Sequence, residues 1–342
     1  MVNRAIPGRA KPFGWSATAL ERTYHLPVSH DPHQTIAVST VWNNPHLASY
    51  LATYRRQFGL PPCTEASGCL RIVNQNGKAA PLPAPTVEGW DLEAVVDVEM
   101  ISAACPHCKI LVVEANDEDL SDLGKTQATA ARLGASVIDD SYGIEESGPV
   151  MTHQKAFSQP GHMIVAASGT WGDDVADFPA NLASATAVGG TELAKAKTAR
   201  GYTEKVWNMP SQGSSGSACS AFVARPAWQH ANACPGRTTA DVSADAVDIA
   251  VYDQAWGGWV SGWGTGPAAA FIAGVYGLAG NAATITPRHL YRFSKDFFDI
   301  TKGNNAVFST PANICDDSYL CRAIKGYDAP TGLGTPNGIS GF

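Results

Sequence analysis

The sequence predicts an α/β fold in which a mainly parallel sheet lies between two layers of helices. Apolar, strand-like runs recur along the chain, and helical stretches with apolar residues at three- and four-residue spacing separate several of them. The 342 residues are 44% hydrophobic and only 16% charged, which is enough for one large core. Because no repeat and no low-complexity linker marks a boundary, we expect a single three-layer α/β/α domain.

The elements alternate as this architecture requires. Helices are expected where the apolar residues follow a helical period, and strands where short runs rich in Val, Ile and Ala stand between turn residues. The expected strands are residues 34–42, 108–115, 135–143, 162–169 and 185–190, and the expected helices are 46–59, 90–104 and 122–134. A glycine-rich turn near residue 264 then leads into a small-residue helix with Pro267 in its first turn.

The two ends of the chain differ from this regular middle. Residues 1–30 are rich in Pro, Gly and basic side chains and are expected to form an extended arm, so that residues 31–342 make the domain. Beyond about residue 195 the sequence turns to Gly, Ser, Trp and Pro. It predicts long loops that are functional or are held by disulfides or a metal.

Charge and cysteine content exclude several classes of protein. The formal net charge is -7 and no run of Lys or Arg forms a stripe, so no nucleic-acid partner is expected. No apolar stretch reaches the ~20 residues that span a bilayer, so no membrane partner is expected either. Eight cysteines fall as sequence neighbours, which predicts four short disulfides in an extracellular protein: Cys63 with Cys69, Cys105 with Cys108, Cys219 with Cys234 and Cys315 with Cys321.

The motif Cys105-Pro-His-Cys108 has a second interpretation, as the site of a thiol-disulfide oxidoreductase. Such a site needs a cysteine at the start of a helix, where the thiol pKa is lowered. This pair instead follows a helical stretch and precedes a strand. The context favours a structural disulfide.

A pair of carboxyl groups stands inside the apolar helical stretch 90–104. Glu93 and Asp97 are four residues apart and therefore share one helix face. If that face is buried, one pKa rises and the pair can share a proton, as in a general base that works at acid pH. An exposed acidic helix face is the alternative, and the apolar surroundings favour burial.

Two further places carry candidate site residues. The strand 162–169 ends at Ser168-Gly169-Thr170, and strand ends followed by glycine-rich turns hold the sites of α/β folds. Near the C-terminus, Asp299 and Asp328 are short carboxylates beside glycines, and such oxygen ligands suit Ca²⁺. Ordinary Asp-Gly turns would explain the second place equally well.

In order and spacing, these stretches resemble the sedolisins, which are serine-carboxyl peptidases with a subtilisin-like fold. The resemblance spans most of the chain. It is carried by WDLEAVVDVEMISAACPHCKILVVEA, VIDDSYGIEES, IVAASG, FPANLASATAVGGTEL, ARPAWQ, ADVSADAVDIAVYD, GTGPAAAFIAGVYGLAG, and FFDITKGNN with GYDAPTGLGTPNG.

The resemblance implies a role for each matching position. In the family a serine attacks the peptide carbonyl, a glutamate takes its proton, one aspartate orients the glutamate and another stabilises the oxyanion. Glu93 and Asp97 match the glutamate and its orienting aspartate. Gly266 stands where the serine belongs, and Thr170 where the oxyanion aspartate belongs. The family's Ca²⁺ site carries over as Asp299 and Asp328 with the backbone carbonyls of Ile300, Ile324 and Gly326.

These losses predict a secreted, monomeric pseudopeptidase that binds a peptide or a small molecule in the old cleft. One alternative is an enzyme that uses Glu93 and Asp97 for acid-base chemistry, with water or a small substrate in the volume left by Gly266. Another is an acid peptidase with a relocated serine, for which nothing in the sequence favours any of the candidates Ser214, Ser215, Ser217 and Ser261. The cleft would be lined by Trp256, Trp259 and Trp263, unless these three pack beneath the turn.

Overall fold

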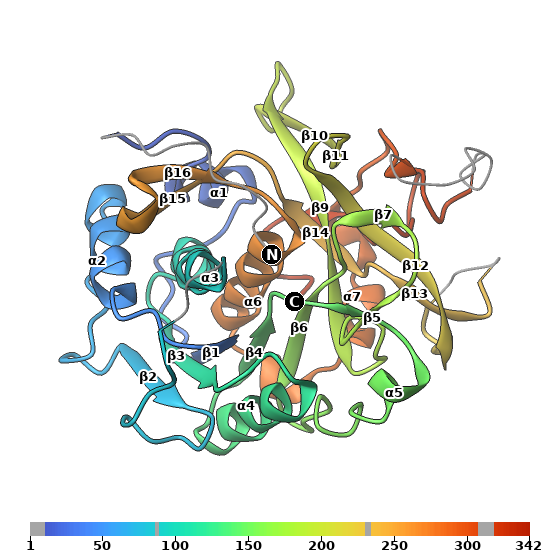
Figure 1. Ribbon diagram of the computed structural model, residues 1–342. Coiled ribbons are helices and arrows are strands. Elements are labelled where there is room, and N and C mark those ends of the chain that lie inside the picture. The colour runs from blue at the N-terminus through green and yellow to red at the C-terminus, as the bar shows by residue number, and fades with distance from the viewer. Residues whose placement is uncertain (1–10, 86–88, 230–233, 307–317) are drawn as a thin grey trace.

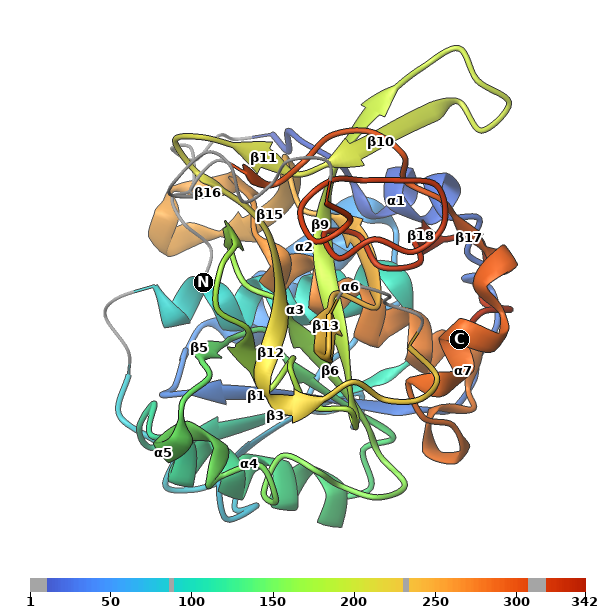
Figure 2. The same cartoon turned by 90° about the vertical axis from the view of Figure 1, so that its right-hand side faces the viewer.

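A mainly parallel sheet of eight strands forms the centre of the single domain (Figure 1). The computed structural model describes residues 11–85, 89–229, 234–306 and 318–342. The strand order is β10 (Tyr202–Val206), β9 (Ala185–Lys195), β6 (Met163–Ala167), β4 (Val137–Asp140), β1 (Thr35–Val41), β3 (Lys109–Ala115) and β2 (Leu70–Asn74), and β14 (Val242–Asp245) pairs with β9. β10 is antiparallel to β9 and forms with it a hairpin that projects from the body of the molecule (Figure 2).

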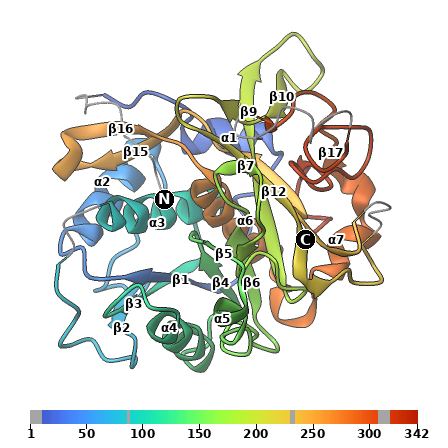
Figure 3. The ribbon, with the colours of Figure 1, turned by 45° about the vertical axis from the view of Figure 1, so that its right-hand side comes forward.

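Helices cover both faces of the sheet, as the sequence predicts. On one face α3 (Trp90–Ala104) and α6 (Thr265–Ala279) lie side by side, with α2 (Leu47–Phe58) packed on α3 (Figure 3). On the other face lies α4 (Leu120–Arg132). α3 and α6 approach closely because small residues meet there: a methyl group added to Gly274 would lie only 2.6 Å from the Cβ of Ala104. Both helices are buried on all sides and carry no charge pattern of a surface helix.

The strand register decides where the carboxyl groups of β4 point. Val38 of β1 pairs with Asp139, and Val38 belongs to the core beneath α3 and α6. Ile138 instead belongs to the core beneath α4. Because successive strand residues face opposite sides, Asp139 points toward α3 and α6, and Asp140 points toward α4.

Part of the N-terminal segment is helical, which differs from the extended arm that the sequence predicts for residues 1–30. Residues 1–10 lie outside the described residues, and α1 (Ala17–Thr23) forms a helix capped by the Ser16 hydroxyl. Leu20 and Tyr24 are buried in the main core, and the Tyr24 hydroxyl donates to Glu204 at 2.8 Å. Apolar burial therefore turns this short segment into a packed helix.

Smaller elements complete the domain and replace some of the predicted loops. Residues 213–224 form a strand because they pair with strands on either side, which sequence composition does not reveal. The elements are β5 (Ile144–Glu145), α5 (Gly148–Met151), β7 (Trp171–Asp173), β8 (Asp177–Phe178), β11 (Asn208–Met209), β12 (Gly213–Ala224), β13 (Gly236–Thr239), β15 (Ile249–Asp253), β16 (Gly258–Gly262), α7 (Arg288–Arg292), β17 (Phe297–Phe298), β18 (Thr335–Pro336) and three short 3-10 turns, Gln254–Trp256, Ala282–Thr284 and Ser294–Asp296.

Three of the predicted disulfides are present: Cys63–Cys69, Cys105–Cys108 and Cys219–Cys234. Cys321 is also disulfide-bonded, and its predicted partner Cys315 lies outside the described residues. Cys105 follows the last turn of α3 and is fully buried with Cys108, which confirms the structural role of this pair. In the described parts of the chain no helix combines the length and apolarity that crossing a membrane requires.

Candidate functional site

Three carboxyl groups meet between α3 and the end of β4. Glu93, Asp97 and Asp139 are 2%, 1% and 0% exposed. Burial raises the pKa of Asp97 well above its usual value, and the nearby carboxyls of Asp139 and Glu93 raise it further. Burial, then Asp140 and Glu93, likewise raises the pKa of Asp139. The prediction that Glu93 and Asp97 are buried together is confirmed, whereas Asp139 is a member that the sequence reasoning missed.

Ser141 connects this carboxyl cluster to the glycine-rich turn. Its hydroxyl donates to the carbonyl oxygen of Gly266 at 2.9 Å and lies 3.2 Å from Oδ2 of Asp139. Ser141 therefore contacts both the carboxyl cluster and the turn, and its hydrogen bond opposes in part the rise that burial causes in the pKa of Asp139.

The carboxyl of Glu93 lies directly against Gly266, in the first turn of α6. A methyl group added to Gly266 would overlap Oε1 of Glu93 and lie 3.0 Å from the carbonyl oxygen of Ser141. The carboxyl of Glu93 therefore occupies the position where the first atom of a side chain at residue 266 would stand. The use of Glu93 and Asp97 with water or a small substrate stays a prediction.

The neighbouring positions of the turn carry no displaced nucleophile. Thr265 is fully buried, and its hydroxyl donates to the carbonyl oxygen of Gly169 at 2.9 Å, away from Glu93. Thr170 is half-buried at the end of β6, where its backbone carbonyl accepts from the amide of Ser214. A carboxylate does lie at this strand end. A methyl group added to Gly169 would overlap Oδ2 of Asp177, a residue that the sequence reasoning did not select.

The four serines considered as relocated nucleophiles are all buried in strands. Ser214, Ser215 and Ser217 of β12 donate to the backbone carbonyls of residues 207, 330 and 320, and Ser261 of β16 donates to Asp248. None of these hydrogen bonds involves Glu93. These serines stabilise the segments whose oxygen atoms they contact, and none of the hydrogen bonds described activates a serine through Glu93.

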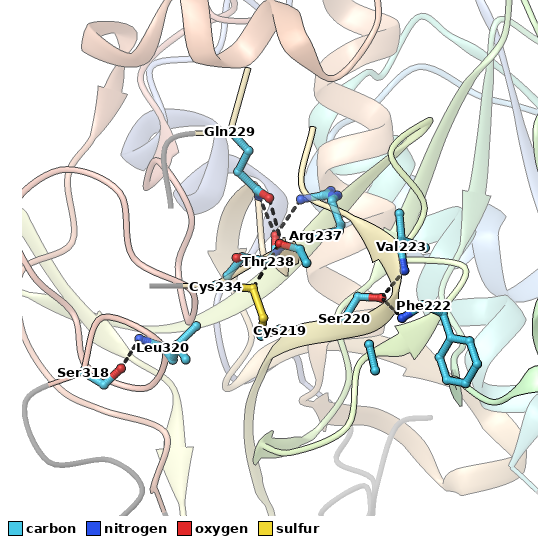
Figure 4. Close-up of a disulfide and its surroundings, with 12 residues drawn as sticks. Cys219, Ser220, Phe222, Val223, Gln229, Cys234, Arg237, Thr238, Ser318 and Leu320 are labelled. Carbon is cyan, nitrogen blue, oxygen red and sulfur yellow. Dashed lines mark hydrogen bonds between the residues drawn. A yellow bond between two sulfur atoms is a disulfide. The ribbon is translucent and has the colours of Figure 1, made fainter. Parts of the chain in front are cut away.

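Ser220, further along β12, does pair with a carboxylate. Its hydroxyl donates to Glu146 at 2.5 Å. It also accepts from the amides of Phe222 and Val223 (Figure 4). The residue is 4% exposed and stands beside the Cys219–Cys234 disulfide. With three hydrogen bonds made, this hydroxyl fixes the turn that follows it.

An open pocket is lined by Trp90 and Tyr142, which stand near the residues of the carboxyl cluster in the sequence. It encloses about 500 Å³, and its lining is mainly apolar with acidic residues at the rim. It is lined by Trp90, Glu118, Asp119, Leu120, Leu123, Tyr142, Gly143, Ile144, Pro149, Val150 and His153. Trp90 stands one helical turn before Glu93, and Tyr142 follows Ser141, whereas the side chains of the carboxyl cluster do not line the pocket.

One wall of this pocket is an extended backbone segment, residues 142–145, which we call the wall segment. Within the described residues the backbone of Tyr142 and Gly143 makes no hydrogen bond, and Ile144 is 47% exposed. The Tyr142 hydroxyl is anchored by donating to Asp140 at 2.8 Å. The wall segment therefore combines a fixed position with free backbone donors and acceptors.

The tryptophans predicted to line the cleft do not do so. Trp259 packs against Tyr54, Phe58 and Tyr252, and Trp263 is buried in a separate cluster with Trp207. Trp256 is 39% exposed, and none of the three lines the pocket. Trp259 and Trp263 are therefore packing residues, although Trp259 packs against α2 rather than beneath the turn.

The candidate metal residues lie together near the C-terminus. Asp328 accepts from the amide and hydroxyl of Thr331 and from the amide of Ile324, and Asp299 accepts from the amide of Gly326. Asp328 is buried and Asp299 is exposed, and burial, with a smaller contribution from Asp299, raises the pKa of Asp328 to about 8. Within the described residues the carbonyl oxygens of Ile300, Ile324 and Gly326 accept no hydrogen bond.

Comparison with known proteins decides the fold. The chain is similar to Pseudomonas sedolisin, a serine-carboxyl proteinase solved with two molecules of pseudo-iodotyrostatin, with a TM-score of 0.76, 19% identity and 96% of each chain covered. It is also similar to an S41 psychrophilic protease, with a TM-score of 0.58, 16% identity, and 97% of this chain and 99% of that chain covered. The chain has the subtilisin-like protease fold. No protein-family model and no curated protein sequence matches it.

A lanthipeptide protease gives a third match, with a TM-score of 0.56, 13% identity and 97% of both chains covered. All three neighbours are proteases, so the subtilisin-like fold of this chain is one that hosts peptide hydrolysis. At these low identities the similarity establishes the fold alone. The chemistry of this chain depends on the carboxyl cluster, the turn at Gly266 and the pocket.

Asp139 could have been found from the sequence by one further step. Asp139 and Asp140 end an apolar strand, and because neighbouring strand residues face opposite sides, one of them had to face α3. Asp177 gave no such signal. It reaches Gly169 only because β8 pairs with β5, where Asp177 stands opposite Glu145.

Proposed function

We propose that this protein is a secreted pseudopeptidase that holds a peptide in its cleft without cleaving it. One observation carries the proposal: the carboxyl of Glu93 is packed against Gly266, where a nucleophile would have to stand. In comparable triads the loss of the nucleophile costs about 10⁶ in rate, and the loss of an oxyanion donor costs about 10²–10³. Both losses together leave no ordinary peptidase turnover.

Peptide binding is supported by the wall segment and the pocket. An extended peptide can pair with the free backbone groups of Tyr142 and Gly143 in the manner of an added strand. The pocket beside them is lined mainly by apolar side chains and has room for a large side chain of the ligand. Backbone pairing provides affinity, and the pocket selects the side chain.

A denatured protein substrate tests the absence of cleavage. The protein is incubated with reduced, alkylated casein from pH 3 to pH 7, and the products are separated by mass. We expect no new fragments at any pH. Fragments formed by the unaltered protein, and lost in Glu93→Gln, would overturn the proposal.

A gain-of-function pair strengthens this test. Gly266→Ser combined with Thr170→Asp restores the two missing groups, although the new Ser side chain requires Glu93 to rotate away from position 266. We expect slow cleavage by the double variant below pH 5 and none by either single variant. Since Glu93 must move, a second double variant with Gly266→Cys, assayed with an alkylating reagent, reports whether the new side chain is reachable.

We also propose that Asp299 and Asp328, with the carbonyls of Ile300, Ile324 and Gly326, hold one Ca²⁺. The donor set fits this ion, because two carboxylates and three carbonyls without hydrogen bonds supply five oxygens, and water completes the six to eight that Ca²⁺ takes. The bound ion would tie the loop of residues 324–328 to the segment that follows β17.

Chelation tests the calcium proposal. A ligand present at 100 times its Kd stabilises the folded state by about 2.7 kcal/mol, so saturating chelator should lower the Tm by several degrees. Asp328→Asn should have the lower Tm and no further response to chelator. Asp122→Asn, at a partly buried position on α4, serves as the control and should respond as the unaltered protein does. An unchanged Tm in chelator would refute the calcium site.

Export and a monomeric state complete the proposal. The three disulfides among the described residues are typical of an oxidising compartment. Sedimentation of the purified protein should give the mass of one chain, and expression in a reducing cytosol should lower the yield of folded protein.

A further inference from the structure

Carboxyl groups stand on both sides of the wall segment. At the rim of the pocket on one side are Glu118 and Asp119. On the other side are the carboxyls of Asp173, Asp174 and Asp177, and Glu145 of the wall segment itself stands opposite Asp177. The wall segment and its pocket therefore lie between two negatively charged groups.

Asp177 is the member closest to the backbone of the cleft. A methyl group added to Gly143 would lie 3.0 Å from the Cβ of Asp177, and one added to Gly169 would overlap its Oδ2. The carboxyl thus sits between the wall segment and the strand end that precedes Thr170. Gly169 in turn accepts the hydroxyl of Thr265, so Asp177 also stands next to the turn that contains Gly266.

The electrostatic surroundings of Asp177 are unfavourable for its charge. Burial raises its pKa to about 7, and Glu145 and Asp174 contribute to the rise. Asp173 shows the same effect, with its pKa raised to about 6 by burial and by Asp174. Neighbouring carboxylates repel one another, and a cation placed beside them relieves this repulsion.

The protein itself supplies no such cation in the described part of the chain. The Lys and Arg ion pairs there lie elsewhere: Lys125 with Asp122, Arg200 with Glu204, Lys205 with Glu192 and Arg237 with Asp241. None of the six carboxyls around the wall segment forms an ion pair among the described residues, and the carboxyl of Asp177 accepts no hydrogen bond there. An apolar pocket with an acidic border on each side is complementary to a ligand with both apolar and positively charged groups.

We infer that the ligand of this cleft is a cationic peptide, with a bulky apolar side chain in the pocket and a Lys or Arg side chain beside Asp177. The inference rests on the proposed function, because it names the class of peptide that the same cleft would bind. The apolar side chain contributes burial against Trp90 and Leu123. The basic side chain restores the charge of Asp177 and distinguishes this peptide from neutral ones.

A set of labelled hexapeptides tests the inference. Each peptide is capped, labelled with fluorescein and made of alanine with one phenylalanine. One of the remaining positions carries Lys, norleucine or Glu, and this position is varied from peptide to peptide. Binding is measured by fluorescence anisotropy at pH 7.5. Norleucine keeps the aliphatic stem of Lys and lacks its charge. We expect the best Lys peptide to bind about fivefold tighter than its norleucine counterpart in low salt, and the difference to shrink as salt screens the charges.

Variants assign the preference to Asp177. Asp177→Asn should reduce the Lys-over-norleucine ratio to about one, and Asp174→Asn should lower it partly. Asp122→Asn removes the same formal charge from a partly buried position on α4 that pairs with Lys125, and it should leave the ratio unchanged. Thermal melts confirm that each variant is folded.

The outcomes separate this inference from the proposed function. Peptides that bind with no preference for Lys would overturn the inference and leave the proposed function standing. Absence of binding by every peptide would count against the proposed function itself. A preference that survives Asp177→Asn would refute the assignment to Asp177.

Discussion

The carboxyl cluster and the wall segment meet at Ser141 but differ in their access to solvent. Glu93, Asp97 and Asp139 are buried, and the hydroxyl of Ser141 is taken up by Gly266. Immediately afterwards, Gly143 and Ile144 are exposed and border an open pocket. The carboxyl cluster is therefore buried, whereas the wall segment, which begins one residue after Ser141, is accessible to a ligand.

The difference between these two regions has a simple physical origin. With no side chain at Gly266, the carboxyl of Glu93 lies against the backbone of α6. The wall segment depends on none of these contacts, because the Tyr142 hydroxyl and the pairing of β5 with β8 hold it in place. Under the proposed function, the binding surface is kept although the reaction is lost.

The largest effect is expected from the pH dependence of stability. The pKa values of Asp97 and Asp139 are raised well above the value of about 3.9 for an unfolded Asp, so folding takes up protons. The stability that this uptake contributes is fully present below about pH 4 and is lost as pH rises through the folded pKa values. Between the unfolded and the folded pKa, the free energy of unfolding falls by about 1.4 kcal/mol per pH unit for each carboxyl that stays protonated in the folded state. Urea unfolding at pH 4 and pH 7 measures the loss.

Asp139→Asn should make this loss smaller, because an amide carries no charge at either pH. Asp122→Asn is the matched control, since its carboxyl is partly buried on α4 and pairs with Lys125, and it should keep the slope of the unaltered protein. An equal slope in Asp139→Asn would mean that the carboxyl cluster is not protonated in the folded state.

An intermediate effect is expected from filling the space at the turn. Gly266→Ala should lower the free energy of unfolding by about 1–3 kcal/mol, because its methyl group overlaps Glu93, and this outweighs the better helix propensity of Ala. Gly148→Ala in α5 is the matched control, since no atom lies within 4 Å of the added methyl. Adding Glu93→Ala to Gly266→Ala should recover part of the loss. No cost for Gly266→Ala would show that Glu93 does not fill the site.

The smallest effect is expected in the open region and concerns binding alone. Trp90 packs against Tyr142 with ring centroids 6.0 Å apart and lines the pocket. Trp90→Ala should weaken binding of the phenylalanine hexapeptides about tenfold, which corresponds to about 1.4 kcal/mol. Trp256→Ala, at an exposed position outside the pocket, should leave the affinity unchanged. Equal losses in both variants would place the peptide elsewhere.

Most of the sheet and its helices follow from the sequence. The strands β1, β3, β4, β6 and β9 and the helices α2, α3, α4 and α6 each have a local pattern of apolar residues that matches their burial. α1 and β12 do not. α1 is short and stabilised by distant contacts such as that of Tyr24 with Glu204, and β12 is rich in Gly and Ser and becomes a strand only through its partners.

The candidate site was predictable in its helical part and not in its loops. Glu93 and Asp97 share a helix face in an apolar segment, so their burial together follows from sequence spacing. The overlap of Glu93 with Gly266 depends on how closely α3 and α6 approach, and the place of Asp177 depends on the pairing of β5 with β8. Both are tertiary distances that no local pattern records.

The most direct test of the central claim is hydrogen exchange of the protein with and without the best-binding hexapeptide, with the peptide mass recorded in the same spectra. The claim is that the wall segment binds while the carboxyl cluster stays closed and inert. It predicts slower exchange at the amides of Tyr142, Gly143 and Ile144, unchanged exchange in the turn of α3 from Glu93 to Asp97, and a peptide recovered at its full mass. Fragments of the peptide, or protection confined to α3, would contradict it.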